Sequence, residues 1–306
     1  MKRRKILGTS AALLGCAALL PARLWAMDSL TLGQARLDIL SDGQLLLPGD
    51  FITRTMPQEE LAPIAARHDL SPYEFEPPCN ITLLRDGPRK VLFDIGAGPD
   101  LMDSVGQLPE ALAALGVEPT EITHLVLTHA HPDHLWGLLD DFGDPFLPNA
   151  EVLIGATEYD YWMRPETITE LGMLREHFAV GAQRRLGRVQ DRLRLIADGD
   201  EILPGVLAID TPGHTPGHMS FHLHQGGQSL MVLADAFDNG HVAFERPHWQ
   251  SASDHDGALA AQTRQKLLAR IIAEDVPVIG YHLPGTGLGR VAQRSDGTHR
   301  FLPESA

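Results

Sequence analysis

Three histidines and one aspartate stand within six residues of this chain, directly after an apolar run. The segment His129-Ala130-His131-Pro132-Asp133-His134 follows the run 122–127, whose composition is typical of a buried strand. Imidazole nitrogens and carboxylate oxygens at this density suit borderline cations such as zinc. The alternative is a polar loop that happens to be rich in histidine. The segment therefore constrains the fold, because a buried strand has to end where polar side chains can surround a cation.

Three more residues of metal-binding types occupy similar settings further along the chain. His214 lies in a turn of Pro and Gly residues, Asp235 ends an apolar run, and His282 follows the inner strand expected at 276–279. A carboxylate has two oxygens, so Asp235 can bridge two cations. Each of these residues stands at the exit of a short apolar run, and an α/β sandwich brings such exits together. The recurrence argues against a loop that is histidine-rich by chance.

In this order, the motifs resemble those of the metallo-β-lactamase-fold hydrolases. The family pattern is a His-x-His-x-Asp-His box, then a lone His, an Asp and a final His, and the resemblance runs from about residue 39 to 302. It implies a four-layer αββα sandwich of the α/β class. It also implies two metal sites, with His129, His131 and His214 at the first, Asp133, His134 and His282 at the second, and Asp235 bridging them. Asp94 matches the family's early Asp-x-Gly, which has a structural role near the site.

Within this family, the chain is most similar to the branch of methyl parathion hydrolase-like enzymes and quorum-quenching lactonases. The long lead-in before the first motif, the turn Gly-His-Thr-Pro-Gly-His and the segment His-Leu-Pro-Gly-x-Gly carry this resemblance. One departure is Trp136, which stands where relatives often have glycine. Its indole either packs on the following helix or narrows the pocket. Another is the segment 288–290, and both departures bear on the substrate.

Residues 1–26 have the pattern of a signal peptide. Lys2-Arg3-Arg4-Lys5 is basic, 6–20 is apolar, and 24–26 is a loose cleavage site. The paired arginines favour the twin-arginine route, which predicts a periplasmic protein. A lipoprotein box ending at Cys16 is the rival interpretation, although the apolar run continues past it. The run is too short to span a bilayer comfortably, so we expect no stable membrane anchor.

The rest of the chain is strongly acidic. Residues 1–26 carry five of the 25 basic residues and no acidic ones, which leaves 20 basic against 40 acidic residues and a formal charge of −20. A surface of this sign repels phosphate backbones, so nucleic acid is not an expected partner. Cys16 and Cys79 are the two cysteines. Once Cys16 is removed, Cys79 is expected to be a buried lone thiol that does not occupy a metal position.

We expect residues 27–306 to form a single domain, since no linker or repeat divides them. Turns at Asp42-Gly43 and Asp86-Gly87 predict two hairpins. The long connection 49–78 is expected to wall the active site, as in the lactonase-like relatives. Helices are predicted over segments that include 167–178 and 257–273, the latter capped by Asp256.

The expected function is hydrolysis of a lactone, ester or organophosphate by a hydroxide that bridges two divalent ions. Zinc is the default metal, although iron, manganese or cobalt suit the same ligands. Asp133 and Asp235 are the predicted catalytic residues, because either carboxylate can move a proton to the leaving group. We expect a small-molecule substrate and, by the resemblance, a homodimer.

Three alternatives remain at this point. A β-lactamase of the same fold is less favoured, because the commonest zinc β-lactamases have cysteine where this chain has Asp235. A glyoxalase-like thioesterase lacks support, because no basic C-terminal helical domain is present to bind glutathione. A periplasmic metal-binding accessory protein of an oxidation pathway is the third. Among the other histidines, His218 is expected to support the site, whereas His255 is assigned to the surface or a loop.

Overall fold

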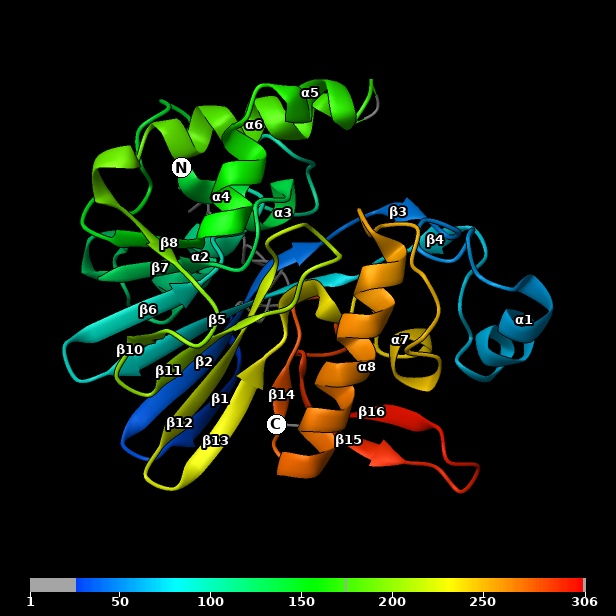
Figure 1. The fold of residues 1–306 in the computed structure, drawn as a ribbon. Helices are drawn as coiled ribbons and strands as arrows, with labels where there is room; N and C mark the ends of the chain where they lie inside the picture. The colour runs from blue at the N-terminus through cyan, green and yellow to red at the C-terminus, as the bar shows by residue number, and fades with distance from the viewer. Residues whose placement is uncertain (1–25, 174, 305–306) are drawn as a thin grey trace, which may run out of the picture.

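Two seven-stranded sheets form the centre of the protein (Figure 1). The computed structural model describes residues 26–173 and 175–304. The first sheet runs antiparallel from its edge to the fourth strand and parallel from there on. In spatial order its strands are β1 (Ala26–Leu32), β2 (Ala35–Gln44), β5 (Pro78–Asp86), β6 (Arg89–Phe93), β7 (His124–Leu127), β8 (Glu151–Gly155) and β9 (Leu193–Ile196).

The second sheet is antiparallel except where β13 pairs with β14. Its strands follow chain order: β10 (Glu201–Leu203), β11 (Val206–Asp210), β12 (Met219–Gln225), β13 (Gln228–Val232), β14 (Val278–Ile279), β15 (Leu288–Gln293) and β16 (His299–Pro303). A separate two-stranded sheet joins β3 (Leu47–Pro48) to β4 (Glu74–Phe75). The α-helices of the described residues are α1 (Gln58–Arg67), α2 (Leu108–Ala114), α3 (Pro132–Leu135), α4 (Ala156–Met163), α5 (Glu166–Glu170), α6 (Glu176–Gly187), α7 (Val242–Glu245) and α8 (Gly257–Glu274).

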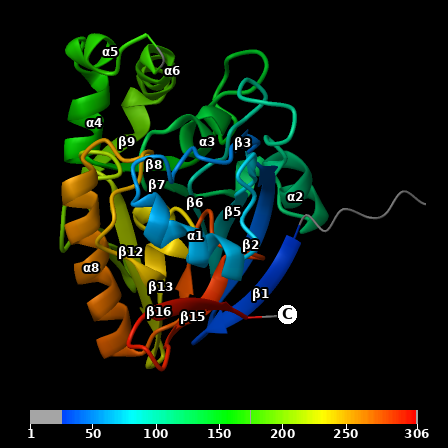
Figure 2. The same cartoon turned by 90° about the vertical axis from the view of Figure 1, so that its right-hand side faces the viewer.

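Three apolar layers hold these elements together. Between the sheets, side chains from both inner faces meet, and the rings of Phe93 and Phe221 lie 5.3 Å apart. The outer face of the first sheet packs against α2, α4 and α6. The outer face of the second packs against α8, which lies along it in Figure 1 and Figure 2. The predicted four-layer αββα sandwich is confirmed.

Two local predictions are wrong. Asp42-Gly43 is no hairpin turn, because β2 continues to Gln44 and instead pairs with β1 across Gly33-Gln34. The buried Asp42 carboxylate accepts backbone hydrogen bonds from a loop far along the chain. The helix expected at 167–178 is broken into α5 and α6, because Gly172 has a φ of 69° that a helix does not allow.

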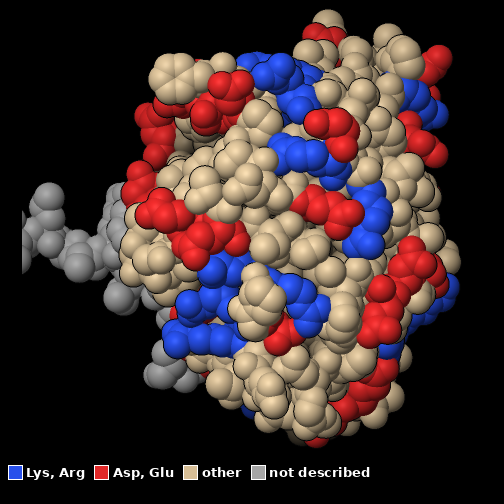
Figure 3. All heavy atoms as spheres, turned by 90° about the vertical axis from the view of Figure 1, so that its left-hand side faces the viewer, with Lys and Arg blue, Asp and Glu red and all other residues tan. Residues whose placement is uncertain are grey.

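The described residues carry charges of both signs at the surface (Figure 3) and contain no membrane-spanning helix. In Figure 3, acidic and basic side chains are interspersed on one face. No helix among the described residues is both long and apolar enough to cross a membrane.

The predicted signal peptide, 1–26, lies outside the described residues except for Ala26, which begins β1. Its role therefore stays a prediction, as does the single domain at 27–306.

Candidate metal centre

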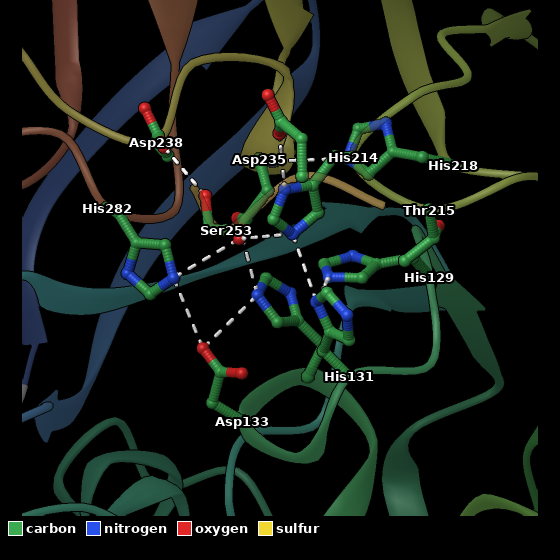
Figure 4. Close-up of polar contacts among 12 residues, drawn as sticks. His129, His131, Asp133, His214, Thr215, His218, Asp235, Asp238, Ser253 and His282 are labelled. Carbon is green, nitrogen blue, oxygen red and sulfur yellow. Dashed lines mark hydrogen bonds and ion pairs between the residues drawn. The ribbon is translucent and has the colours of Figure 1, made fainter. Parts of the chain in front are cut away.

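The predicted site residues stand at the ends of strands from both sheets. His129 and His131 follow β7, and Asp133 and His134 lie on α3 directly after them. The turn after β11 carries His214. Asp235 follows β13 and His282 follows β14. All of these residues are buried or nearly so, and the structure brings all of them together (Figure 4 shows most of the set).

The first cluster consists of three imidazoles. Nδ1 of His131 lies 3.1 Å from Nε2 of His129 and 3.0 Å from Nε2 of His214. One ring nitrogen of each histidine thus faces a common point. Three converging imidazole nitrogens are a ligand set that suits zinc.

The second cluster combines carboxylates and imidazoles. Asp133 Oδ2 lies 3.2 Å from His282 Nε2 and 3.4 Å from His134 Nε2. Asp235 stands between the clusters, with Oδ1 3.3 Å from His134 Nε2. Its Oδ2 is 3.3 Å from both His214 Nε2 and His282 Nε2. Asp235 therefore lies between the two clusters, within 3.3 Å of nitrogens from both.

The polar atoms at the centre support the assignment of cations to it. Within the described part of the chain, Asp133 Oδ2, His134 Nε2 and Asp235 Oδ1 are buried and accept or donate no hydrogen bond. Such atoms are costly to bury without a partner, and a divalent cation is a partner that suits all three. The residues therefore fit two metal ions.

Hydrogen bonds behind the ligands fix the orientation of several rings. His134 Nδ1 lies 2.8 Å from Asp94 Oδ2, and the same carboxylate accepts from the backbone and the hydroxyl of Thr128. His282 Nδ1 lies 2.9 Å from the carbonyl of Pro78. In both rings the other nitrogen, Nε2, is thereby left to face the centre. Asp94 has the structural role that the resemblance implied.

His218 supports the centre from the side of Asp235. Its Nε2 accepts a hydrogen bond of 3.1 Å from the backbone N–H of Asp235, and its Nδ1 lies 2.8 Å from the Thr211 hydroxyl. Burial lowers the pKa of His218 to about 3, so that the ring is neutral and can accept this bond. It is a supporting residue, as the sequence indicated.

Charge divides the imidazoles into two groups. Burial and the neighbouring rings lower the pKa of His129 and of His131 well below the usual value. Burial also opposes protonation of His134 and His282. There Asp235 and Asp133 outweigh it, so that the pKa of His134 is raised well above normal and that of His282 to about 10. Without metal, the raised pKa values favour protonated rings in the second cluster, and bound ions would have to displace those protons.

Two cavities lie next to the centre. The one directly above it has a volume of about 200 Å³ and is lined largely by apolar side chains, together with Arg175 and Asp238. A second, of about 610 Å³, lies under α1 within the predicted wall segment 49–78. Ile52, Phe75, Pro77 and His282 line both. The two cavities therefore adjoin at these four residues.

Trp136 and Cys79 lie near the centre without being among the predicted ligands. The Trp136 indole packs on α6, with the Arg185 guanidinium 4.5 Å from its ring centre, and it lines neither cavity. The packing interpretation is therefore correct. Cys79 is a buried free thiol, as predicted, and its sulfur lies within 4.8 Å of ligand atoms of Asp133 and His282. Burial raises the pKa of this thiol well above normal, which favours the protonated form.

Sequence reasoning missed two residues behind the first cluster. His255 was assigned to the surface or a loop, but its Nε2 lies 3.2 Å from Nε2 of His131. Asp254 was not singled out, yet its Oδ1 lies 3.1 Å from Nδ1 of His214. No motif marks either residue, because they meet the ligands through the fold of a loop.

Comparison with known proteins identifies several relatives. The chain is 28% identical to the N-acyl homoserine lactonase AttM of Agrobacterium fabrum over 184 residues, which are 57% of this chain and 63% of that protein. The lactonase AiiA of Bacillus thuringiensis subsp. kurstaki is 24% identical over 180 residues, 58% of this chain and 62% of its own. The chain thus spans just under two thirds of the length of these curated relatives.

Solved structures match over more of the chain. The structure of AidC, described as a dizinc quorum-quenching lactonase in complex with the product N-hexnoyl-L-homoserine, has a TM-score of 0.85 at 25% identity. The match covers 92% of this chain and 98% of AidC. The hydrolase AbOPH matches with the same TM-score, identity and coverage. The sequence profile of the metallo-beta-lactamase superfamily matches residues 75–282. The chain belongs to the metallo-β-lactamase superfamily.

Proposed function

We propose that this protein is a dinuclear-metal hydrolase that opens lactone rings, with N-acyl homoserine lactones as the foremost substrate class. The observation that carries the proposal is the convergence of the seven predicted ligands, three of which have a buried polar atom without a hydrogen bond, beneath an apolar cavity. The superfamily and the lactonase relatives support a metal-dependent hydrolase. An apolar cavity beside polar groups suits an acyl chain attached to a polar ring.

The protein's own residues divide the work of this reaction. His129, His131 and His214 would hold one ion, Asp133, His134 and His282 the other, and Asp235 would contact both. When bound, the ions activate water and polarise the carbonyl of the lactone. Asp133 and Asp235 both line the cavity above the centre, so either carboxylate can pass a proton to the ring oxygen that leaves.

The substrate's acyl chain has two apolar spaces available. Leu47, Phe51 and Phe178 line the cavity over the centre. Beyond Ile52 and Phe75, the larger cavity continues under α1, where Leu61 and Val242 contribute apolar surface. A short chain fills the first space, and a longer one extends into the second.

A substrate panel tests the function directly. Metal-replete protein is assayed with an acyl-homoserine lactone, an aryl ester, methyl paraoxon, nitrocefin and a glutathione thioester. We expect the lactone to have the highest kcat/KM, and His131→Ala to lower both that rate and the metal content measured by elemental analysis. A higher kcat/KM for nitrocefin or for the thioester than for the lactone would contradict the proposal and indicate a β-lactamase or a thioesterase instead. Turnover of none would favour a metal-binding accessory protein.

Export, metal identity and assembly are further proposals. We propose that residues 1–26 direct the protein to the periplasm by the twin-arginine route, that the resident metal is zinc, and that the protein is a homodimer. Replacing Arg3 and Arg4 by lysine should leave a reporter fused to this segment in the cytoplasm. Elemental analysis of protein purified from the periplasm, and its mass in solution by light scattering, check the other two proposals.

A further inference from the structure

Two neighbouring residues contact two ligands of the first cluster from behind. Asp254 Oδ1 lies 3.1 Å from Nδ1 of His214. His255 Nε2 lies 3.2 Å from Nε2 of His131, and the backbone N–H of His255 donates to the carbonyl of His214 at 3.0 Å. We call Asp254-His255 the support dipeptide. A single short loop thus contacts two rings of the first cluster, His131 and His214, that lie on separate segments of the chain.

The contacts determine which nitrogen of each ring carries a proton. His131 turns Nδ1 to the centre, and His214 turns Nε2 to it. The opposite nitrogens must then carry the hydrogens and need acceptors. The Asp254 carboxylate accepts from His214, and the lone pair of His255 Nε2 accepts from His131. Each contact holds its ring in the orientation and tautomer that a cation requires.

The loop that carries the support dipeptide is itself anchored from α8. Arg264 is almost completely buried, and its Nη2 donates to the carbonyl of Trp249 at 3.0 Å and lies 3.6 Å from Asp254 Oδ2. Its Nη1 donates to the carbonyl of Ala236, next to Asp235. The same guanidinium thus links the support dipeptide to the segment that carries the bridging carboxylate.

The second cluster has supports of its own. Asp94 holds His134, and the carbonyl of Pro78 holds His282. Neither contact involves the loop 249–256. A change in the support dipeptide should therefore affect the first cluster and leave the second intact.

We propose that Asp254 and His255 are positioning residues that set the retention of the ion held by His129, His131 and His214, independently of the other ion. This rests on the dinuclear centre of the proposed function, but on no particular substrate. Loss of a hydrogen-bonded support of this kind typically lowers metal affinity about 10- to 100-fold. The effect requires loss of the acceptor, and replacing the acceptor by another should restore retention.

The experiment compares paired variants of the full chain. His255→Phe keeps a ring but removes the acceptor, whereas His255→Gln supplies an amide oxygen instead. Asp254→Ala and Asp254→Asn form the corresponding pair. His248→Phe is the matched control, because His248 is exposed and lines neither cavity. Each protein is loaded with cobalt(II) and dialysed against increasing chelator, and bound cobalt is followed by elemental analysis and by its visible absorption.

The wild type and His248→Phe should release cobalt in two steps that correspond to two ions per chain. His255→Phe and Asp254→Ala should lose the ion of the first cluster at a chelator concentration about 10- to 100-fold lower than the wild type requires. Release of the ion held by the second cluster should be unchanged. In His255→Gln and Asp254→Asn, the chelator concentration needed to release this ion should return toward the wild-type value. Circular dichroism verifies folding, and if the Phe or Ala variant does not fold, the matching Gln or Asn variant is judged by whether its two steps stay separate and unshifted.

Two results would overturn the proposal. In one, His255→Phe and Asp254→Ala retain both ions as firmly as the wild type. In the other, the Gln and Asn variants lose both ions together, which indicates a purely structural role for the loop. Because the readout is bound metal, a wild type that holds two ions but opens no lactone would refute the proposed function without affecting this inference.

Discussion

Single charges at the metal centre decide how the protein takes up its ions. His134 and His282 lie beside Asp133 and Asp235, and these carboxylates raise the pKa of both imidazoles despite their burial. The pKa of His214 is also raised, because Asp254 and Asp235 outweigh the opposing effect of burial. Rings that are protonated at neutral pH in the metal-free protein have to lose those protons before they can ligate.

Zinc binding should therefore release protons. Near neutral pH we expect roughly two to three protons per chain, from His134, His282 and His214, when the metal-free protein is saturated. Apparent zinc affinity should fall as pH falls, because protons compete more strongly for the same rings. Toward pH 10, where His282 is about to titrate, proton release should decline. Calorimetric titration in buffers of different ionisation enthalpy measures the release, and an observed heat independent of buffer would contradict it.

At the scale of elements, Asp42 joins β2 to the loop that precedes α2. Its Oδ2 accepts from the N–H groups of Ala97 and Gly106, and its Oδ1 accepts from that of Leu108 at 2.8 Å. The carboxylate is almost fully buried. A strand residue thus supplies the acceptors for three backbone donors that secondary structure leaves unpaired.

Asp42→Asn should destabilise the fold. An amide offers one acceptor oxygen, so its NH₂ group would face a backbone N–H, and a buried donor would remain unsatisfied. The expected cost is about 1–3 kcal/mol in the free energy of unfolding, measured by urea denaturation. Glu110→Gln on the exposed side of α2 is the control and should change the midpoint little. Equal midpoints for the two variants would show that the Asp42 contacts do not stabilise the loop.

Trp136 shows how one element fixes the position of another. It follows α3, which carries Asp133 and His134, and its ring packs on α6 so closely that a Cβ at Gly181 would lie 2.7 Å from it. Arg185 donates to the Trp136 carbonyl at 2.9 Å. The indole therefore anchors the ligand-bearing segment to the helical layer.

Removing this anchor should be costly. Trp136→Ala leaves a cavity between α3 and α6 and should reduce the free energy of unfolding by about 3–5 kcal/mol. Thermal unfolding of the metal-free variant provides the measurement. The smaller change Trp136→Phe keeps an aromatic ring at the site and should cost less. If both variants unfold at the same temperature as the wild type, the indole contributes no packing energy.

At the scale of the whole molecule, the segment 49–78 adds a second space to the site. Figure 1 shows α1 at one side, next to α7. Arg67 at its end pairs with the buried Glu245 of α7 at 2.7 Å, which holds α1 in place. The cavity beneath α1 is larger than the one over the metal centre and shares a wall with it. The segment 49–78 can therefore set which acyl-chain lengths the proposed lactonase accepts.

Filling the α1 cavity should change chain-length preference. Ala65 lines it, so Ala65→Trp should exclude roughly two methylenes of a decanoyl chain. At about 0.8 kcal/mol for each buried methylene, this should lower kcat/KM for a decanoyl lactone relative to a butanoyl lactone by about tenfold. Ala66→Trp, exposed on the same helix and outside the cavity lining, is the control. If both variants kept the wild-type ratio, long acyl chains would have to leave the centre by another path.

The amino-acid sequence by itself determined the ligand types, the strands that precede them and the class of fold. The box at 129–134 and the later His214, Asp235 and His282 are visible because metal chemistry restricts each position to a few residue types, and apolar runs report burial locally. The hairpin predicted at Asp86-Gly87 is present, with its two-residue turn one position on at Gly87-Pro88, since such turns depend on local backbone conformation.

Tertiary structure alone decided the roles of residues that act through distant partners. Asp42-Gly43 has the local signature of a turn, but long-range hydrogen bonds keep it in a strand. His255 and Asp254 resemble surface residues in sequence, yet the loop before α8 folds them against His131 and His214. The larger cavity likewise depends on how α1 packs beside α7. Hydrogen bonds and contacts between residues tens to hundreds of positions apart leave no periodic or local pattern, so they are apparent only once the chain has folded.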